Sequence, residues 1–357
     1  MTLPFVRELF TTLARQSPLA EAGSAWSAGR NVRLTGLTPA AQLLAAAQLQ
    51  QLTRRPVMLV VPSNHWAEEW RDSLATFADL TGVASHEDER PLAMPAFEID
   101  PYEGLSPHPA ILEQRVHALW RWVEGLPILI APVVAAATRL PPPEHYLGLV
   151  RRLRRGDTVD LAGLAEHLEL IGYQRQEPVE MPGQFSIRGG LLDVFSPEAQ
   201  RPVRLELFGD EIESLREFDP ATQRSVRPLE HVQLLPLTSI PLTPALQQRL
   251  GDPAPGWEFR VPGLEGYHHT AADMVERPLI LLSEPEQTLP ELDAWWRRLR
   301  RRHAEAPGPE PETIFLTPEE FRARLARQAI IEMRELRIEH LDLDAEAMEL
   351  GALPQAA

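Results

Sequence analysis

The stretch NVRLTGLTPAAQLLAAAQLQQLTRRPVMLVV, residues 31–61, gives the clearest indication of the fold. Its pattern predicts a strand at 31–35, a turn at Gly36, a helix at about 39–53 and a second strand at 57–61. The second strand is a continuous apolar run, which is typical of a parallel strand covered on both faces. This region therefore predicts an α/β domain built on a parallel sheet.

The alternation of strands and helices continues along the chain. A helix at about 110–124 precedes PILIAPVVAAATR, residues 127–139, which is typical of a buried strand followed by a short helix. Such alternation implies a doubly wound parallel sheet, and we assign residues 1–140, together with about 232–250, to this domain. A helix at 65–80 is expected to place four apolar side chains on one face: Trp66, Trp70, Leu74 and Phe77.

The pattern changes at LPPPEHY, whose three prolines mark a domain boundary. Residues 141–231 are rich in strands, and Gly209-Asp210 suits a two-residue hairpin turn, so we expect a small α+β domain inserted in the larger one. Residues 251–340 are expected to form a second α/β subdomain. Residues 341–357 are expected to form an acidic, flexible tail.

The composition narrows the classes of function. The chain has 357 residues, a formal net charge of −16, no cysteine and no lysine, so all 35 basic residues are arginine. The acidic charge opposes DNA, and we expect weak, salt-sensitive DNA binding at most, from the arginine clusters at 151–155 and 297–302. Without cysteine the chain has no disulfides, which fits a reducing, cytoplasmic compartment. No apolar run approaches the length of a membrane span, and no membrane partner is expected.

The first strand–turn–helix stands where a nucleotide-binding domain carries its phosphate loop. A working loop reads G-x-x-x-x-G-K-[ST], in which backbone amides and the lysine hold the phosphates. Here Thr35 and Gly36 are followed by Leu-Thr-Pro-Ala-Ala-Gln, and proline removes one amide donor. We interpret Thr35 and Gly36 as a degenerate phosphate loop, and we expect no catalytic residues and no cofactor for this chain.

Other groups of polar residues have a structural interpretation beside the functional one. His268 and His269 are adjacent, so on a helix they point in different directions, and we expect no metal site. The segment WWRRLRRRH, residues 295–303, mixes aromatic side chains with cations, as nucleic-acid sites do. Alternatively, its tryptophans belong to the core and its arginines face solvent.

The stretch PGQFSIRGGLLDVFSP, residues 182–197, raises the question of what Arg188 does. In a pleated strand Phe185 points to one face while Arg188 points to the other, away from the core. Arg175 precedes this strand closely, and we expect the two arginines to share one exposed face. They could bind an acidic partner there, or they could pair with Glu206 or Glu213 across the sheet.

The same stretch, with RPVRLELFGDEIESLREFD, resembles the N-terminal region of the bacterial transcription-repair coupling factors. It is also similar to the excinuclease subunit UvrB, but the missing lysine and the absence of a tyrosine-rich hairpin between Phe97 and Gln114 favour the coupling factors. The resemblance implies a degenerate RecA/helicase-like parallel-sheet domain with an inserted domain of the UvrA-binding type, and a further α/β domain.

The resemblance also implies a function and a set of contacts. By position, Arg175, Phe185 and Arg188 are the candidate UvrA contacts, whereas Ser186 stands where UvrB has another arginine. The chain would be a non-catalytic module that recruits UvrA to stalled RNA polymerase for nucleotide excision repair. ATP, magnesium, RNA polymerase and DNA would be bound by the translocase and other parts of the full-length family protein. The alternatives are a UvrB-like ATP-dependent excinuclease or helicase subunit and a stand-alone UvrA-binding regulator.

Overall fold

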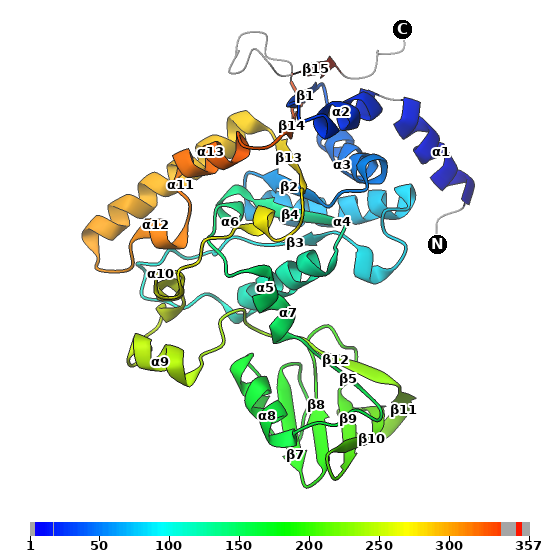
Figure 1. Cartoon of the computed structure of the whole chain (residues 1–357), viewed down its shortest axis with the longest axis vertical. Helices are drawn as coiled ribbons and strands as arrows, with labels where there is room; N and C mark the ends of the chain where they lie inside the picture. The colour runs from blue at the N-terminus through cyan, green and yellow to red at the C-terminus, as the bar shows by residue number, and fades with distance from the viewer. Residues whose placement is uncertain (1–3, 17, 337–347, 352–357) are drawn as a thin grey trace. The chain divides into compact units, whose positions relative to one another are not determined.

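The computed structural model describes residues 4–16, 18–336 and 348–351 of the chain (Figure 1). Its contacts divide the chain into two compact units. The large unit contains Met1–Ser106, Arg121–Pro143 and Phe259–Ala357, and the small unit contains Pro107–Trp120 and Glu144–Glu258. Each unit has its own sheet.

The large unit is built on a seven-stranded parallel sheet with the strand order β15-β1-β14-β13-β2-β4-β3. Strands β2, β4 and β13 are buried along their whole length, as their continuous apolar runs require. The strands are β1 Val32–Thr35, β2 Val57–Val61, β3 Leu92–Ala93, β4 Ile128–Pro132, β13 Leu279–Ser283, β14 Ile330–Met333 and β15 Met348–Gly351.

Helices accompany this sheet (Figure 1). The predicted strand–helix–strand at 31–61 is confirmed, because α3 runs from Pro39 to Thr53 between β1 and β2. The predicted apolar face of α4 is confirmed too, since Trp70 and Leu74 lie in the core and Trp66 and Phe77 pack against it. The helices of the large unit are α1 Pro4–Gln16, α2 Pro18–Ser27, α3 Pro39–Thr53, α4 Asn64–Thr81, α6 Val133–Ala136, α10 Val261–Glu265, α11 Pro285–Glu305, α12 Pro311–Ile314 and α13 Pro318–Leu325, with 3-10 turns at Glu87–Glu89 and Ala271–Asp273. Helix α5, Pro109–Glu124, and the 3-10 turn Trp257–Arg260 each contain residues of both units.

The predicted domain boundaries differ from this arrangement. Residues 251–340 do not form a sheet of their own, because β13 and β14 lie between β1 and β2 in the large sheet. Residues 232–250 belong to the small unit instead of the large one. Within the predicted tail at 341–357, residues 348–351 form β15, which pairs with β1. The other residues of this tail lie outside the described residues. Which strands pair is decided by contacts between distant segments, and local sequence patterns do not contain that information.

The small unit is an α+β structure, as predicted. Its main sheet has the order β11-β10-β9-β8-β7-β6, in which only β6 and β7 are parallel, and β5 pairs with β12. The bounds are β5 Arg151–Arg154, β6 Gln174–Arg175, β7 Gln184–Arg188, β8 Leu191–Val194, β9 Val203–Phe208, β10 Glu211–Phe218, β11 Ser225–Leu229 and β12 His231–Leu234, with helices α7 Pro143–Leu149, α8 Leu161–Leu170 and α9 Pro244–Leu250.

Two turns of the small sheet depend on glycine. The predicted hairpin is confirmed, since Phe208 pairs with Glu211 across Gly209-Asp210 and Gly209 has a φ of 63°. At the turn between β7 and β8, Gly189 has a φ of 60°, which other residues rarely adopt. A Cβ on Gly190 would lie 2.8 Å from the carbonyl oxygen of Leu207. Gly190 thus lets β9 approach the turn between β7 and β8, which directly follows Arg188.

Within the described residues, no helix combines the length and the apolar character needed to cross a membrane.

Candidate functional site: a polar surface of the small unit

The three residues proposed as partner contacts differ widely in exposure. Arg188, the last residue of β7, keeps 44% of its side chain exposed. Arg175 in β6 is also exposed. Phe185 has no exposed surface and is one of the largest fully buried side chains, so it supports this surface from the core and has no surface with which to contact a partner directly.

Arg188 is held in place by two carboxylates. Its Nη2 donates to Asp193 Oδ2 at 2.8 Å, and its Nη1 lies 3.3 Å from Glu177 Oε1. Asp193 lies in β8 and is only 2% exposed, whereas the Glu177 side chain is 57% exposed. Arg188 therefore has one buried anchor and one partner that is open to solvent.

A second arginine shares the buried carboxylate. Arg204 in β9 donates to Asp193 through Nε at 2.6 Å and through Nη2 at 2.8 Å, and its guanidinium lies 4.7 Å from the centre of the Phe218 ring. The hydrogen bonds to Asp193 raise the pKa of Arg204 above its ordinary value. We call these three residues the arginine cluster: Arg188, Asp193 and Arg204. Because Arg204 already compensates the buried charge with two bonds, Arg188 is the outer cation of the cluster.

Register explains how the cluster forms and corrects two expectations. Residues opposite each other on adjacent strands share a face, and Asp193 is opposite Arg204. Glu206, considered above as an alternative partner, instead accepts a hydrogen bond from Ser214 and forms an ion pair with Arg216. The backbone carbonyl oxygen of Glu213 accepts a hydrogen bond from Arg155. Among the described residues, the ion-pair partners of Arg188 are Glu177 and Asp193, and Glu213 is not one of them.

The expected shared face of Arg175 and Arg188 is also wrong. The parallel register places Arg175 opposite Phe185, and the alternation along β7 turns Arg188 to the other face. Ser186 lies on the same face as Arg188, but it is buried at 4% exposure. Only Arg188 of the proposed contacts therefore belongs to the arginine cluster.

Sequence reasoning missed Asp193, Glu177 and Arg204. One signal was present, because the carboxylate of Asp193 interrupts the otherwise apolar strand LLDV. A buried carboxylate requires a paired cation, so this pattern could have predicted an arginine partner. Which arginines would reach it depends on the strand register.

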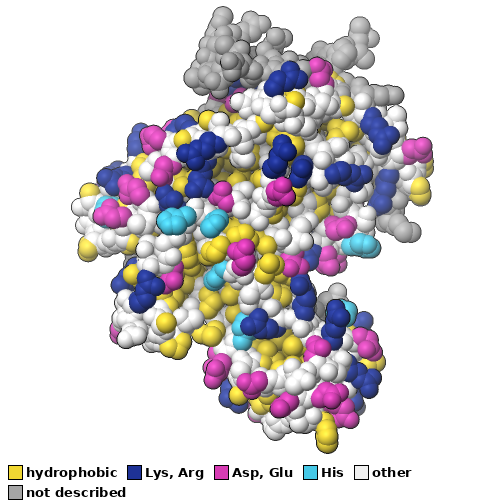
Figure 2. All heavy atoms as spheres, viewed as in Figure 1, with side chains coloured by type: hydrophobic (Ala, Val, Ile, Leu, Met, Phe, Trp, Pro, Cys, Tyr) yellow, Lys and Arg dark blue, Asp and Glu magenta, His cyan; other side chains and the backbone are white. Residues whose placement is uncertain are grey.

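The charges around the cluster are mixed. Figure 2 shows acidic and basic side chains interspersed on the visible face of the small unit. At the opposite edge of the sheet from β7, for example, Arg227 in β11 forms two hydrogen bonds with Glu217, at 2.6 and 2.7 Å. A surface with charges of both signs favours binding of a protein with a complementary charge pattern over binding of a long polyanion.

The degenerate phosphate loop of the large unit is closed by its own chain. Thr35 is buried at the end of β1, and Gly36 has a φ of 76°. The amide of Leu37, where a phosphate oxygen would be bound in a working loop, donates to the carbonyl oxygen of Arg334 at 3.0 Å. The turn is therefore held by a neighbouring strand end and not arranged around an open anion site.

Buried polar side chains fill the space beside this turn. The side-chain amide of Gln42, at the start of α3, donates to Leu37 O at 3.2 Å and to Glu284 Oε1 at 2.6 Å. Its carbonyl accepts from Ser283 Oγ at 2.7 Å, and Glu284 also accepts from the amide of Glu335 at 2.8 Å. A buried carboxylate at this position repels phosphate. Among the described residues, no group of three metal-ligating side chains lies close enough to hold a metal ion.

Comparison with known proteins gives a consistent assignment. Residues 152–239 match the family described as the UvrB interaction domain. The chain is 32% identical to the transcription-repair-coupling factor of Myxococcus xanthus over 355 residues, which is 88% of this chain and 29% of the relative. It is 31% identical to that of Bacillus subtilis and 30% identical to that of Escherichia coli, in each case over 60% of this chain and 18% of the relative.

The chain thus spans less than a third of the length of these relatives. The arginine cluster lies inside the matched segment, whereas the closed turn at Gly36 lies outside it. The chain is homologous to the N-terminal region of the transcription-repair-coupling factors and carries a UvrB interaction domain.

Proposed function

We propose that the small unit of this chain binds UvrA through the surface around Arg188, and that the chain recruits UvrA to stalled RNA polymerase for nucleotide excision repair. The observation that carries this proposal is the position of Arg188. It is fixed by a buried carboxylate yet keeps 44% of its side chain exposed, within a segment that matches the UvrB interaction domain.

The geometry of the cluster favours binding of a carboxylate on the partner. Arginine stays charged and presents a planar fork that pairs with carboxylates through two hydrogen bonds. Because Asp193 already orients the guanidinium, less side-chain freedom is lost when the partner binds. The remaining partner, Glu177, is solvent-exposed and can be replaced by an acidic group of UvrA.

We further propose that this chain acts without nucleotide chemistry of its own. The support is the closed turn, where Gln42 and Glu284 occupy the place of a phosphate-binding loop and lysine is absent from the sequence. This arrangement argues against a UvrB-like ATP-dependent subunit. In the proposal, ATP-driven movement on DNA belongs to the remaining length of the relatives, which this chain does not cover.

The test is a titration of purified UvrA into the fluorescently labelled chain. An interface arginine often contributes about 2 kcal/mol, so Arg188→Ala is expected to weaken binding about 30-fold. Arg227→Ala removes an arginine that is also ion-paired with a carboxylate, on the opposite edge of the same sheet, and is expected to leave the affinity unchanged.

Urea unfolding of both variants accompanies the titration. Arg204 keeps Asp193 paired when Arg188 is removed, so the free energy of unfolding is expected to fall by less than about 1 kcal/mol. Equal affinities for wild type and Arg188→Ala would refute the proposal. So would a loss of binding that matches a loss of folded protein.

A further inference from the structure

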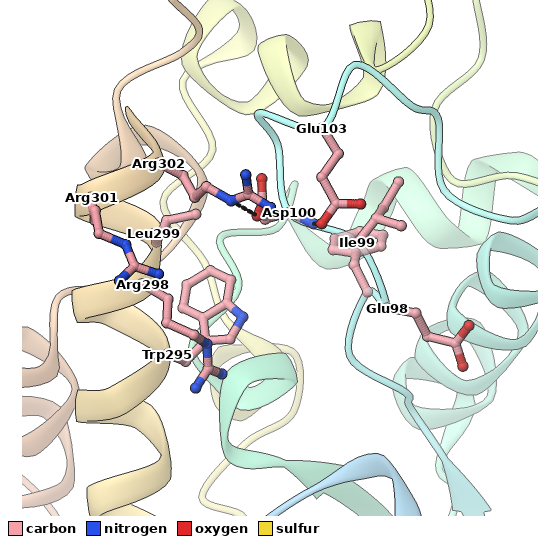
Figure 3. Close-up of a pocket in the computed structure, with 10 residues that line it drawn as sticks. Glu98, Ile99, Asp100, Glu103, Trp295, Arg298, Leu299, Arg301 and Arg302 are labelled. Carbon is pink, nitrogen blue, oxygen red and sulfur yellow. Dashed lines mark hydrogen bonds and ion pairs between the residues drawn. The ribbon is translucent and has the colours of Figure 1, made fainter. Parts of the chain in front are cut away.

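The large unit contains two regions rich in arginine, and they differ in their surroundings. The first is the C-terminal half of α11, where a cavity of about 410 Å³ is lined by Trp295, Arg298, Arg301 and Arg302. Figure 3 shows that Asp100, in the loop at 98–103, faces Arg302 of this helix, whereas the carboxylate of Glu98 points away from it. The acidic lining residues are Glu98, Asp100 and Glu103.

These acids cancel the positive charge of the cavity. Arg302 Nε lies 3.5 Å from Asp100 Oδ2. In the same helix, Arg300 forms an ion pair with Glu312 at 3.0 Å. Three acidic residues and three arginines therefore line this cavity together, and the acidic residues oppose the entry of a phosphate group. The phosphate contact considered for residues 295–303 gains no support here, and the structural alternative is the better one.

The second region lies at the N-terminal ends of four adjacent strands. The sheet order places β1, β14, β13 and β2 side by side. Each of these strands is preceded within three residues by arginine. We call this group the arginine edge: Arg30 before β1, Arg327 before β14, Arg277 before β13, and Arg54 and Arg55 before β2.

Sheet geometry gives this edge a regular spacing. Adjacent strands lie about 4.8 Å apart, so four neighbouring strands spread their starting loops over about 15 Å. Within the part of the chain that the structure describes, none of the five arginines has a carboxylate within ion-pair distance. The five arginines thus form a local basic region in a chain whose formal net charge is −16.

A cavity of about 380 Å³ opens at this edge, and Arg277 and Arg327 both line it. The side-chain amides of Asn31 and Gln328 line it as well, and its lining contains no acidic residue. The cavity wall is fixed, because Trp26 Nε1 donates to Ala329 O at 2.9 Å and Asn31 Oδ1 accepts from the amide of Ile330 at 3.1 Å.

We propose that the arginine edge binds the phosphate backbone of DNA without reading its sequence. Arginine side chains with asparagine and glutamine amides are typical phosphate ligands. A row of cations over about 15 Å matches the regularly spaced negative charges of a phosphate backbone better than it matches a single small anion. The binding site lies in the large unit and does not depend on the proposed contact with UvrA in the small unit.

The test is fluorescence anisotropy of a labelled DNA duplex of random sequence, titrated with the full chain at several salt concentrations from about 50 mM upward. The double variant Arg277→Glu with Arg327→Glu removes two phosphate contacts. It is expected to reduce the slope of log K against log salt by about 1.8, at about 0.9 for each phosphate. Its affinity at the lowest salt is expected to fall at least 10-fold.

The matched control is Arg298→Glu with Arg301→Glu, which changes the net charge equally at the mixed cavity of α11. It is expected to retain the wild-type slope, and melting curves verify that both double variants are folded. Three results would overturn the proposal: no DNA binding by wild type at the lowest salt, equal losses in the two double variants, or displacement of DNA by a poly-glutamate peptide at lower concentration than by unlabelled duplex. The last result would assign the edge to an acidic protein partner.

Discussion

Glu284 in the large unit and Asp193 in the small unit are both buried carboxylates, exposed to 9% and 2%, and both are held by bonds from two other segments. The bonds to Glu284 come from Gln42 and from a backbone amide. Those to Asp193 come from two arginines, one of which, Arg188, remains 44% exposed. Glu284 therefore helps to close the turn after β1, whereas Asp193 holds Arg188 in an exposed position at the surface.

The difference lies in the donors. When neutral amides donate the hydrogen bonds to a buried carboxylate, the hydrogen-bond network is complete inside the protein. Two guanidinium groups on one carboxylate leave a surplus positive charge, and the outer group can direct its free donors to another molecule. Four substitutions test whether the two buried carboxylates and their surroundings differ in this way.

The largest effect is expected for Phe185→Ala, since this ring is fully buried beneath the polar face of β7. Removing a buried phenylalanine costs about 4 kcal/mol, measured as the loss in free energy of unfolding in urea. Phe208→Ala, at a hairpin position that is 82% exposed, is expected to change this free energy by less than about 0.5 kcal/mol. A mild effect of Phe185→Ala on stability, combined with lost UvrA binding, would instead make Phe185 a direct contact.

Asp193→Ala comes next, because it leaves Arg188 and Arg204 without their buried anion. We expect a loss of about 3 kcal/mol in the free energy of unfolding. Arg216→Ala breaks the half-exposed pair with Glu206 on the same face and is expected to cost no more than about 1 kcal/mol. If the two variants unfold at the same urea concentration, Asp193 does not anchor the cluster.

Gln42→Ala tests the closed turn. It removes one of the two donors to the Glu284 carboxylate and the acceptor of the Ser283 hydroxyl, and it is expected to lower the free energy of unfolding by about 2 kcal/mol. Gln50→Ala, at a half-buried position of the same helix, is expected to change it by less than about 0.5 kcal/mol. Binding of a fluorescent ATP analogue is expected to be absent in wild type and in both variants. Binding by the Gln42→Ala variant would mean that this network alone blocks a usable phosphate site.

The smallest effect is expected for Glu177→Gln. It removes the exposed carboxylate that competes for Arg188, and an exposed ion pair contributes about 0.7 kcal/mol, so affinity for UvrA should rise about 3-fold. Glu180→Gln changes the net charge equally on the same loop and is expected to have no effect. A decrease in affinity with Glu177→Gln would show that Glu177 orients Arg188 instead of competing for it.

Local features of the fold could be predicted from the sequence. The bounds of α3 and β2, the apolar face of α4 and the hairpin at Gly209 follow from periodicity and turn chemistry within short segments. The insertion of β13 and β14 between β1 and β2 could not be predicted, because it brings together segments more than two hundred residues apart.

The same limit applies to the candidate site. The pleat of β7 correctly turns Arg188 away from Phe185. Its pairing with Asp193, and the placement of Arg175 on the opposite face, depend on the register of β6 and β8 against β7. A sequence pattern alone does not contain that register.

Hydrogen exchange of the chain, alone and with excess UvrA, is the most direct test that the small unit binds through the surface around Arg188. We predict slower exchange in peptides covering residues 176–193, which carry Glu177, Arg188 and Asp193. Peptides covering 36–42 at the closed turn and 225–234, which contain β11 and β12, should exchange at unchanged rates. Protection confined to 225–234 or to the large unit, with 176–193 unaffected, would contradict the account.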